Sequence, residues 1–181
     1  SYYDLTNTSL KVLHCGNAAC NSGNISATVD NTGNVGQYTS ITVGPDGLGL
    51  VSYHDAGNGT LKVLHCGNML CNSGNVSATV DSAASVGTHS SIAIGADGLA
   101  LVSYYDATNG HLKALRCGNT TCTSGNISNT LDSAFSVGAY TSVAIDPSGL
   151  PIISYYDINN QDLKVFRCVD PACAPYVRVG R

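Results

Sequence analysis

A unit of 51 residues recurs along this chain with no insertion or deletion between copies. Its clearest marker is a Ser-Tyr-Tyr-Asp segment, with His as the third residue in one copy, which begins at Ser1, Ser52, Ser103 and Ser154. A fixed period of about 50 residues is typical of stacked or radially arranged copies of one supersecondary unit. Because near-identical copies present near-identical surfaces, the pattern favours multivalent binding or assembly over a single asymmetric active site.

The second copy shows which elements one unit contains. Residues 40–43 alternate polar and apolar side chains, as a half-buried strand does, and residues 48–54 are almost continuously apolar. Residues 60–65 and 75–80 are predicted as a third and a fourth strand, and turns rich in Gly, Asp and Asn separate the strands. Residues 81–87 are interpreted as a linker to the next copy.

Four short antiparallel strands per copy predict an all-β chain, and four-stranded sheets at this period are the signature of β-propeller blades. We therefore expect a β-propeller of about four blades in a single repeat domain, 1–181. It divides into a partial repeat, 1–39, and the repeats 40–90, 91–141 and 142–181. A β-helix would need a shorter period, and a β-sandwich would not repeat its loops so faithfully.

The phase of the repeat predicts an unpaired strand edge. The chain opens at the second strand of a copy and ends near Tyr176–Val179, where the fourth strand of the last copy belongs. This arrangement gives fifteen strands where four complete blades need sixteen. Imperfect ring closure, a longer repeat array and a strand supplied by a neighbouring chain all remain open, and unpaired strand edges invite pairing with another chain.

Composition narrows the function classes. Charged residues make up 11% of the chain, against about 25% in an average soluble domain, and Glu and Trp are absent. Strand- and turn-forming residues dominate, which disfavours exposed helices. A net charge of −4 without a basic cluster argues against nucleic acid as a partner. The longest apolar runs are shorter than the roughly 18 residues that a membrane-spanning helix needs.

The eight cysteines form four pairs with four residues between the partners, at the same place in each copy. The pairs are Cys15/Cys20, Cys66/Cys71, Cys117/Cys122 and Cys168/Cys173. Even counts at fixed spacing predict disulfides and an oxidising compartment, so we expect a secreted, extracellular protein. Because every copy must close on its own, we expect one local disulfide per blade at a hairpin tip.

Metal binding is the alternative use of paired cysteines. Structural zinc needs four converging ligands, and His14 and His65 directly precede a cysteine in two copies. Arg116 and Arg167 stand at that position in the later copies, so we favour disulfides and predict no metal site there. Covalent haem attachment needs a His after the second cysteine, which none of the copies has. We therefore expect no cofactor, with Ca²⁺ as the alternative discussed below.

The layout of the repeat resembles that of secreted bacterial β-propeller-like repeat proteins, related to kelch and sialidase-type repeats. The resemblance covers the whole chain and depends on Asp46-Gly47, Asp97-Gly98 and Ser148-Gly149 before the second strand, with Tyr-Tyr-Asp and Leu-Lys positions after it. The chain departs from both named types in having no Trp. The resemblance implies a propeller fold and an extracellular or surface-attached protein.

Repeated Tyr and Asp residues are the candidate ligand-binding positions. They are Tyr3, Asp4, Tyr53, Asp55, Tyr105, Asp106, Tyr156 and Asp157. Because the paired tyrosines alternate across a strand, one should pack in the core, and the other is free to line a channel or stack on a sugar. The carboxylates either bind Ca²⁺ as a ring or accept hydrogen bonds from turn N–H groups, and we favour the turn.

Other polar residues repeat without pointing to one chemistry. The lysines, one per copy, are expected to be surface residues paired with Asp: Lys11, Lys62, Lys113 and Lys164. Three histidines break the repeat and are expected to be isolated surface substitutions: His54, His89 and His111. Asn-x-Ser/Thr sequons, the acceptor motif for N-glycosylation, occur at Asn7, Asn24, Asn58, Asn75, Asn119 and Asn126.

We predict that the protein is not an enzyme. Common nucleotide-binding, metalloprotease and serine-hydrolase motifs are absent, and a glycosidase would have to use Asp alone. The favoured function is a secreted binding or adhesion module, with repeated shallow sites for carbohydrate or for a surface protein. The alternative is a structural subunit that joins copies of itself into an extracellular fibre or array through open strand edges.

Overall fold

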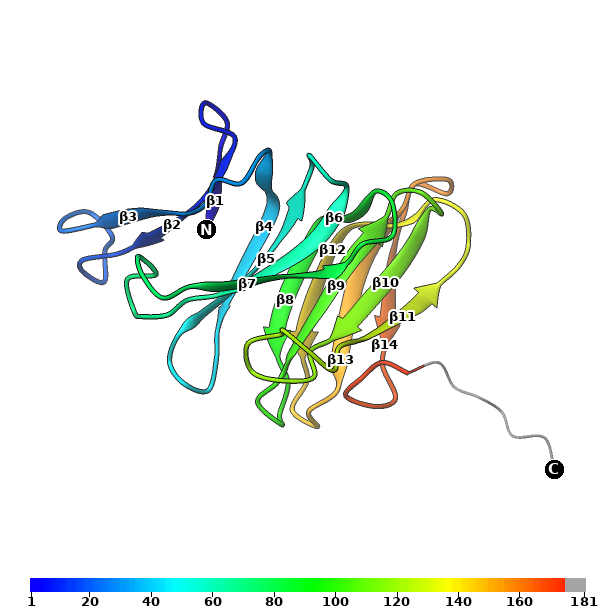
Figure 1. The fold of residues 1–181 in the computed structure, drawn as a ribbon. Coiled ribbons are helices and arrows are strands. Elements are labelled where there is room, and N and C mark those ends of the chain that lie inside the picture. Colours follow the sequence, from blue (N-terminus) through cyan, green and yellow to red (C-terminus); the bar gives the residue numbers. More distant parts are fainter. Residues whose placement is uncertain (175–181) are drawn as a thin grey trace.

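The computed structural model describes residues 1–174 and contains four antiparallel sheets of three or four strands (Figure 1). The first sheet comprises β1 (Tyr2–Asp4), β2 (Ser9–His14) and β3 (Ile25–Asp30). The second comprises β4 (Val35–Val43), β5 (Gly49–Asp55), β6 (Thr60–His65) and β7 (Val76–Asp81). The third comprises β8 (Val86–Ile94), β9 (Ala100–Asp106), β10 (His111–Arg116) and β11 (Ile127–Asp132). The fourth comprises β12 (Val137–Ile145), β13 (Pro151–Asp157) and β14 (Asp162–Arg167).

The all-β prediction is confirmed, and consecutive strands pair as neighbours in every sheet. The four sheets follow one another in chain order, with the first and the fourth at opposite ends of the row in Figure 1. Residues 1–174 show no closed ring of sheets, so the propeller remains a prediction. The predicted strand at Tyr176–Val179 lies outside the described residues.

The first strand of each complete sheet is longer than predicted. In the second copy it begins at Val35, five residues before the predicted start at residue 40. Its register against β5 shifts twice, between Val35 and Gln37 and again before Ser40. This irregularity breaks the alternation of apolar and polar residues, which is why the sequence pattern indicated a linker where the structure has a strand.

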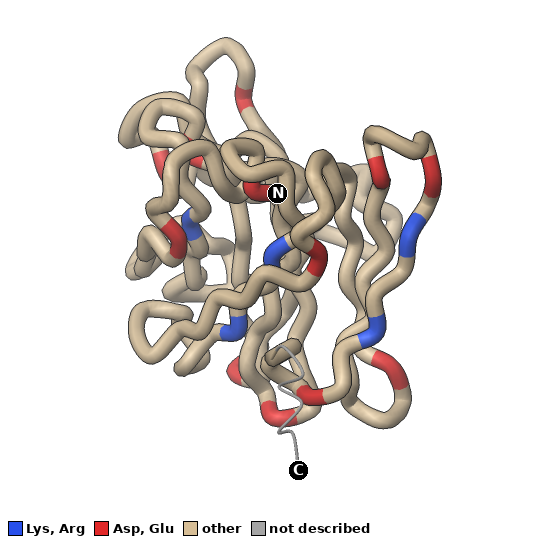
Figure 2. Tube along the Cα trace, turned by 90° about the vertical axis from the view of Figure 1, so that its right-hand side faces the viewer, with Lys and Arg blue, Asp and Glu red and all other residues tan. Residues whose placement is uncertain are grey.

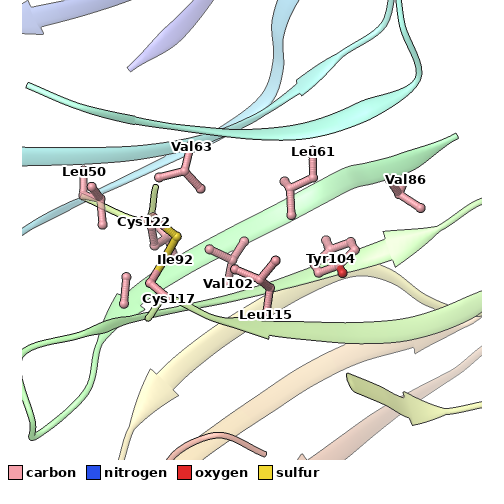
Figure 3. Close-up of a cluster of buried hydrophobic side chains, with 11 residues drawn as sticks. Leu50, Leu61, Val63, Val86, Ile92, Val102, Tyr104, Leu115, Cys117 and Cys122 are labelled. Carbon is pink, nitrogen blue, oxygen red and sulfur yellow. A yellow bond between two sulfur atoms is a disulfide. The ribbon is translucent and has the colours of Figure 1, made fainter. Parts of the chain in front are cut away.

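Neighbouring sheets pack through apolar clusters to which several strands of the following sheet contribute. Figure 3 shows the cluster between the second and third sheets, where Leu61 and Val63 face Val102 and Leu115. All four are almost inaccessible to solvent. Burial of each such side chain stabilises the fold by about 1.5–3 kcal/mol. The clusters bind the sheets together and fix the relative position of their first strands.

A three-residue contact crosses each of the three junctions between sheets. At the first junction the Tyr53 hydroxyl and the Lys62 ammonium both donate to one carboxylate oxygen of Asp30, at 2.7 and 2.6 Å. Tyr53 and Lys62 are partners across β5 and β6, while Asp30 ends β3 of the preceding sheet. We call each such contact a clasp. The other two clasps are Tyr104–Lys113–Asp81 and Tyr155–Lys164–Asp132.

All four lysines pair with Asp, as predicted: Lys11 with Asp4 of its own copy, and the three clasp lysines with an Asp of the preceding copy. The expectation of a surface position is wrong for Lys62 and Lys113, whose side chains are mostly covered. Burial alone would raise the pKa of Asp30, but hydrogen bonds from Lys62, Thr32 and Tyr53 lower it to about 2. Burial raises the pKa of Tyr53 far above its ordinary value, and the Asp30 carboxylate raises it further. Both shifts keep the carboxylate charged and the phenol neutral at physiological pH, which is the arrangement the clasp requires.

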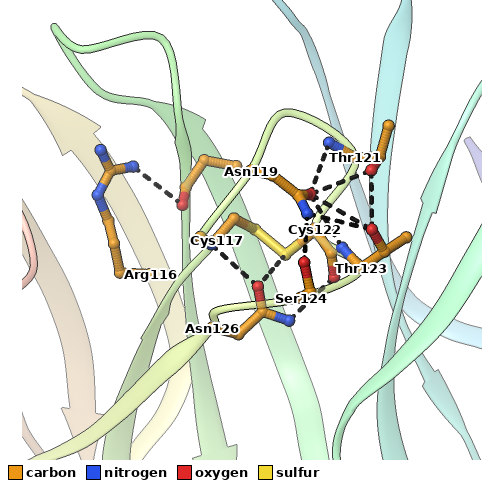
Figure 4. The surroundings of a disulfide bond; sticks show 10 residues. Arg116, Cys117, Asn119, Thr121, Cys122, Thr123, Ser124 and Asn126 are labelled. Atoms are coloured by element: carbon orange, nitrogen blue, oxygen red, sulfur yellow. Dashed lines mark hydrogen bonds between the residues drawn. A yellow bond between two sulfur atoms is a disulfide. The ribbon is translucent and has the colours of Figure 1, made fainter.

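All four predicted disulfides are present, one in each copy. They join Cys15 to Cys20, Cys66 to Cys71, Cys117 to Cys122 and Cys168 to Cys173. The tip around Cys117–Cys122 is drawn in Figure 4, where Asn126 accepts from the Gly118 N–H and donates to the Cys122 carbonyl. A Cβ at Gly118 would lie 2.3 Å from the backbone of Gly125, so this crossing of the chain needs glycine. The disulfide and the asparagine together hold the tip in one conformation.

The fourth disulfide differs from the prediction that every copy carries its disulfide at a hairpin tip. In the first three copies the bond lies between two paired strands, β2 and β3, β6 and β7, or β10 and β11. Cys168 instead follows β14, and the strand expected beyond Cys173 lies outside the described residues. The turn between these cysteines is held by the Asp170 carboxylate, which accepts from the Ala172 and Ala174 N–H groups at 2.8 and 3.1 Å. The prediction of a disulfide at a hairpin tip is therefore confirmed for three copies. For Cys168–Cys173 the disulfide is confirmed, but its place at a hairpin tip is not.

The second cysteine of each pair has a left-handed backbone, which the spacing of the cysteines did not predict. The φ angles are 54° at Cys20, 53° at Cys71, 58° at Cys122 and 50° at Cys173. The N–H of each of these cysteines donates to the carbonyl three residues earlier, at 3.0 or 3.1 Å. A tight turn therefore brings the two sulfur atoms together in every copy, including the fourth.

The side chains of all six sequon asparagines are hydrogen-bonded within the protein. Each side-chain amide donates a hydrogen bond to a nearby carbonyl, carboxylate or hydroxyl oxygen: Asn7 to Asp4, Asn24 to Cys20, Asn58 to Asp55, Asn75 to Cys71, Asn119 to Ser124 and Asn126 to Cys122. A glycan on these nitrogens would compete with those bonds. The sequence motif is therefore explained by turn structure.

Candidate functional site

The first strands of the second, third and fourth sheets each carry a β-bulge with an aromatic residue at its centre. In β4 the residues Tyr38 and Thr39 together oppose Tyr53 of β5, because Gln37 pairs with His54 and Ser40 with Ser52. A bulge of this kind redirects a side chain out of the regular pleat. The equivalent aromatic residues are His89 in β8 and Tyr140 in β12.

These three aromatic residues all have a left-handed backbone. Their φ angles are 51° at Tyr38, 55° at His89 and 52° at Tyr140. Side chains of this size rarely adopt that conformation, which costs about 1–3 kcal/mol per residue and persists only where the surroundings impose it. Three equivalent instances indicate that the bulge is built into the repeat and is not an accident of one copy.

Hydroxyl groups next to the bulges fix their geometry. Ser90, which follows His89, is hydrogen-bonded to the Ser52 hydroxyl at 2.9 Å and donates to the Tyr38 carbonyl at 2.9 Å. Thr141 likewise donates to the Ser103 hydroxyl at 2.8 Å. Each bulge is thereby tied to the sheet before it, directly beside the aromatic residues.

A glycine before each bulge allows the first strand to approach the preceding sheet. Gly87 has a φ of 91°, and a Cβ there would lie 2.8 Å from the Cα of Leu61. Only glycine combines this backbone angle with so close an approach. The strand can therefore cross the buried leucine and still place His89 beside the preceding copy's aromatic residue.

The bulges bring the three aromatic rings into one row across three sheets. The ring centroids of Tyr38 and His89 are 4.4 Å apart, and those of His89 and Tyr140 are 4.2 Å apart. Neighbouring planes are tilted by 52° and 51°, so the rings pack at an angle. Such contacts contribute about 0.5–1.5 kcal/mol beyond burial. Tyr38 remains 45% exposed and Tyr140 72% exposed, so both ends of the row are accessible to solvent.

A second row of rings flanks the first. His54 lies 6.3 Å from Tyr38, and Tyr105 lies 6.4 Å from His89, centroid to centroid. Tyr156 stands in the same relation to Tyr140, at 6.3 Å. We call these six residues the aromatic strip: Tyr38, His89, Tyr140, His54, Tyr105 and Tyr156.

The aromatic strip is electrically neutral at physiological pH. Burial lowers the pKa of His89, and it also lowers the pKa of His54, whose Nδ1 lies 2.9 Å from the Val86 carbonyl oxygen. Within residues 1–174 the ion pairs all involve other side chains. Figure 2 shows acidic and basic positions interspersed along the chain trace. The strip thus offers apolar ring faces together with phenol and imidazole hydrogen-bonding groups.

The candidate tyrosines lie in two different environments. Tyr105 and Tyr156 are half-buried and belong to the strip, and Tyr3, at the equivalent position, donates to the Asn34 side-chain oxygen at 2.6 Å. Tyr53 is fully buried in a clasp, and His54 takes the strip position in that copy. The candidate at this position is corrected to His54, because strand alternation sends adjacent side chains to opposite faces.

The candidate carboxylates are placed in turns. Asp55 accepts hydrogen bonds from the backbone and side-chain amides of Asn58, at 3.0 and 2.9 Å. Asp4, Asp106 and Asp157 do the same with the asparagine three residues on. No group of three or more metal-ligating side chains occurs in residues 1–174, and calcium at these positions remains a prediction.

An apolar pocket of about 200 Å³ between the first and second sheets is the other candidate site. Its walls include Val12, Leu13, Ile41 and the Cys66–Cys71 disulfide, and its only ionisable side chain is His14. Few of its groups can direct a polar ligand. The strip presents exposed rings with polar atoms at their edges, so we consider it the better candidate.

The sequence prediction missed the central residues of the strip. Tyr38 and Tyr140 lie between the positions interpreted as linker and the predicted start of the first strand, where no element was predicted. The prediction that His54 and His89 are isolated surface residues is wrong. One signal was available: an aromatic residue followed by Thr or Ser recurs two residues after a glycine in three copies, at Gly36, Gly87 and Gly138. What the sequence does not give is the bulge that turns these rings together.

No protein-family model and no curated protein matches this chain. Among solved structures it is similar to a fucose lectin from Kordia zhangzhouensis in complex with methyl-fucoside, with 13% sequence identity and a TM-score of 0.45. The match covers 71% of this chain and 90% of the lectin chain. A likeness at this TM-score is too loose to carry an argument about fold or ligand. Within residues 1–174 no helix is long and apolar enough to cross a membrane.

Proposed function

We propose that this protein binds carbohydrate through the aromatic strip and catalyses no reaction. The observation that carries the proposal is the row formed by Tyr38, His89 and Tyr140, three rings in strained bulges on consecutive sheets, exposed at both ends of the row. Strained backbone that the structure over-determines is characteristic of functional sites. The strip is the one place among the described residues where this strain, exposed aromatic surface and repetition coincide.

The chemistry of the strip favours a neutral sugar. A pyranose ring offers an apolar C–H face and peripheral hydroxyls, which complement an aromatic face with a polar edge. The low charge of the chain and the neutrality of the strip give no advantage to an anionic ligand. The carboxylates that a glycosidase would need are engaged in turns and clasps, at Asp55 and Asp81 for example.

Affinity gel electrophoresis tests the proposal. The protein would be run at pH 7 through gels that contain soluble neutral polysaccharides: a β-glucan, an α-glucan, a xylan and a mannan. We expect retardation by at least one polymer, and loss of that retardation in Tyr38→Ala and Tyr140→Ala. The matched control is Tyr2→Ala, because Tyr2 is 40% exposed and lies outside the strip. Equal mobility in all gels, together with silence on a glycan array, would refute carbohydrate binding.

We propose a propeller architecture and an extracellular location, both of which are consistent with carbohydrate binding. Strands β4, β8 and β12 lie next to one another at the strip, which supports blades arranged around them as in a propeller. Four disulfides support an extracellular location. Adhesion to a glycan-bearing surface is the corresponding biological role. A thiol titration of protein purified from its native source should find no free sulfhydryl.

Assembly through open strand edges remains a second proposal. In residues 1–174, β1 has a hydrogen-bonded neighbour on one side only, so its other edge is available to a further strand. Sedimentation velocity over a hundredfold range of concentration separates the two functions. A monomer that still binds polysaccharide would exclude assembly as the primary role.

A further inference from the structure

The spacing of the rings makes three repeated positions into one site. Tyr38 and Tyr140 each lie within 4.4 Å of His89, centroid to centroid. A ligand stacked over His89 therefore also meets both tyrosines, and three ligands cannot bind side by side. This geometry differs from the expectation of separate shallow sites in each copy.

The exposure of the rings indicates how far the ligand extends. The end rings Tyr38 and Tyr140 are 45% and 72% exposed, whereas His89 between them is half-buried. The largest uncovered aromatic surface thus lies at the end of the row and not at its centre. A single sugar over the middle of the row would leave the outer surfaces of both tyrosines in water.

The second row backs the first, since His54 is buried and Tyr105 and Tyr156 are half-buried. His54, Tyr105 and Tyr156 run beside the first row at 6.3–6.4 Å. The Ser90 hydroxyl beside the β8 bulge bonds the Ser52 hydroxyl of β5 in the preceding sheet, so the floor of the site is rigid. A rigid surface that continues across three sheets is suited to an extended ligand, because little conformational entropy is lost on the protein side.

We propose that the strip binds an internal stretch of a neutral linear polysaccharide, laid across the second, third and fourth sheets, and not a single terminal sugar. This inference rests on the carbohydrate-binding function proposed above. The bound stretch would cover all three rings together, with His89 beneath its middle and the two tyrosines beneath its ends. Affinity would then come from the addition of contacts along the chain and not from one deep pocket.

Isothermal titration calorimetry at pH 7 with oligosaccharides of one to six units tests this inference. The oligosaccharides would be fragments of whichever polysaccharide retards the protein in the gels. We expect the association constant to rise at least about tenfold, or about 1.4 kcal/mol, from one unit to three, and then to level off. Level affinity from one unit to six would overturn the extended mode and leave carbohydrate binding intact, whereas retardation by none of the polymers would remove both.

Variants at the end and the centre of the row give a second readout. Tyr140→Ala should reduce the gain from one unit to three, because one end of the platform is lost. His89→Ala should weaken short and long oligosaccharides alike, because every bound form covers the centre. The control Tyr2→Ala should leave the length dependence unchanged. Equal effects of Tyr140→Ala on one unit and on three would contradict the inference.

Discussion

Two adjacent tyrosines of β9 show how one repeat builds two different regions. Tyr104 is fully buried and donates to Asp81 at 2.6 Å in a clasp. Tyr105, the next residue, is half-buried and stands beside His89 in the aromatic strip. Alternation along a strand sends one ring into the junction and the other to the strip. Stability and binding are therefore assigned to different side chains, and they should be separable by substitution.

Acid should have the largest effect on the junctions, because it acts on all three clasps together. Asp30, Asp81 and Asp132 have folded-state pKa values below the ordinary value, so each stabilises the fold above that value, near pH 4. This stabilisation is lost as the pH falls toward the folded pKa, about 2 for Asp30. Denaturant titrations at pH 7, 4, 3 and 2 should show a steep loss below pH 4. A flat profile would contradict the role of the clasps.

Removal of one clasp carboxylate should have the next largest effect. In Asp81→Asn the Lys113 ammonium loses its counter-charge, and the oxygen that it shares with the Tyr104 hydroxyl becomes a weaker, neutral amide acceptor. Breaking a buried pair costs about 3 kcal/mol of unfolding free energy, and the partial exposure of Lys113 places the expected loss at about 2–3 kcal/mol. Urea unfolding measures it. Polysaccharide affinity of the folded protein should stay within twofold of the parent, and a large loss of affinity would show that the two regions are coupled.

Loss of one disulfide should destabilise the protein without a change in binding. Closing the short Cys117–Cys122 loop contributes about 2 kcal/mol by restricting the unfolded chain. Thermal unfolding of the Cys117→Ser, Cys122→Ser double variant measures this contribution. The corresponding variant at Cys66 and Cys71 is the matched control, and a similar loss at both would show that the copies are equivalent.

A substitution at the end of the aromatic strip should weaken binding without loss of stability, the reverse of what we expect for the clasp and disulfide variants. Tyr140→Gly removes an exposed ring and introduces a residue that tolerates the left-handed backbone. We expect about tenfold weaker polysaccharide binding, together with unfolding free energy that is unchanged or up to about 1 kcal/mol higher. Gel retardation and urea unfolding on the same sample measure both. Weaker stability with intact binding would reverse the assignment of the two regions.

The smallest effect on the unfolding free energy is expected when the buried Tyr104 loses its hydroxyl group. Tyr104→Phe keeps the ring in the junction and removes one hydrogen bond to Asp81, which still has Lys113. A loss of about 1 kcal/mol is typical of such a bond. Tyr105→Phe is the matched control one residue away, and its unfolding free energy should not change. Equal losses in the two variants would remove the distinction between the two faces of β9.

The sequence predicts the parts of this molecule that the repeat and local chemistry determine. The period and the turn residues give strands within a few residues of their true bounds, as for β6 at Thr60–His65. The spacing of Cys66 and Cys71 gives the disulfide, because no other partner is equally near in every copy. The Asp55–Asn58 turn follows from the known preference of Asp to cap such turns.

Contacts between copies are not predictable in the same way. The repeat shows that Lys62 needs an acidic partner, but it does not show that Asp30 of the preceding sheet is chosen over Asp55 of its own. The strip escapes prediction for a related reason. Tyr38 and His89 meet only because a bulge reverses the direction of both side chains, and a left-handed tyrosine has no signature in a single sequence.

The clasp also bears on how the chain unfolds. Each carboxylate belongs to one copy and its two donors belong to the next, so a sheet that melts alone would leave a charged group stranded on its neighbour. Repeat proteins whose copies meet only through apolar surface can lose them one at a time. Here the cost of an unpaired charge at every junction should make the sheets unfold in one cooperative transition. Thermal or mechanical unfolding should therefore show a single step and not a series of steps.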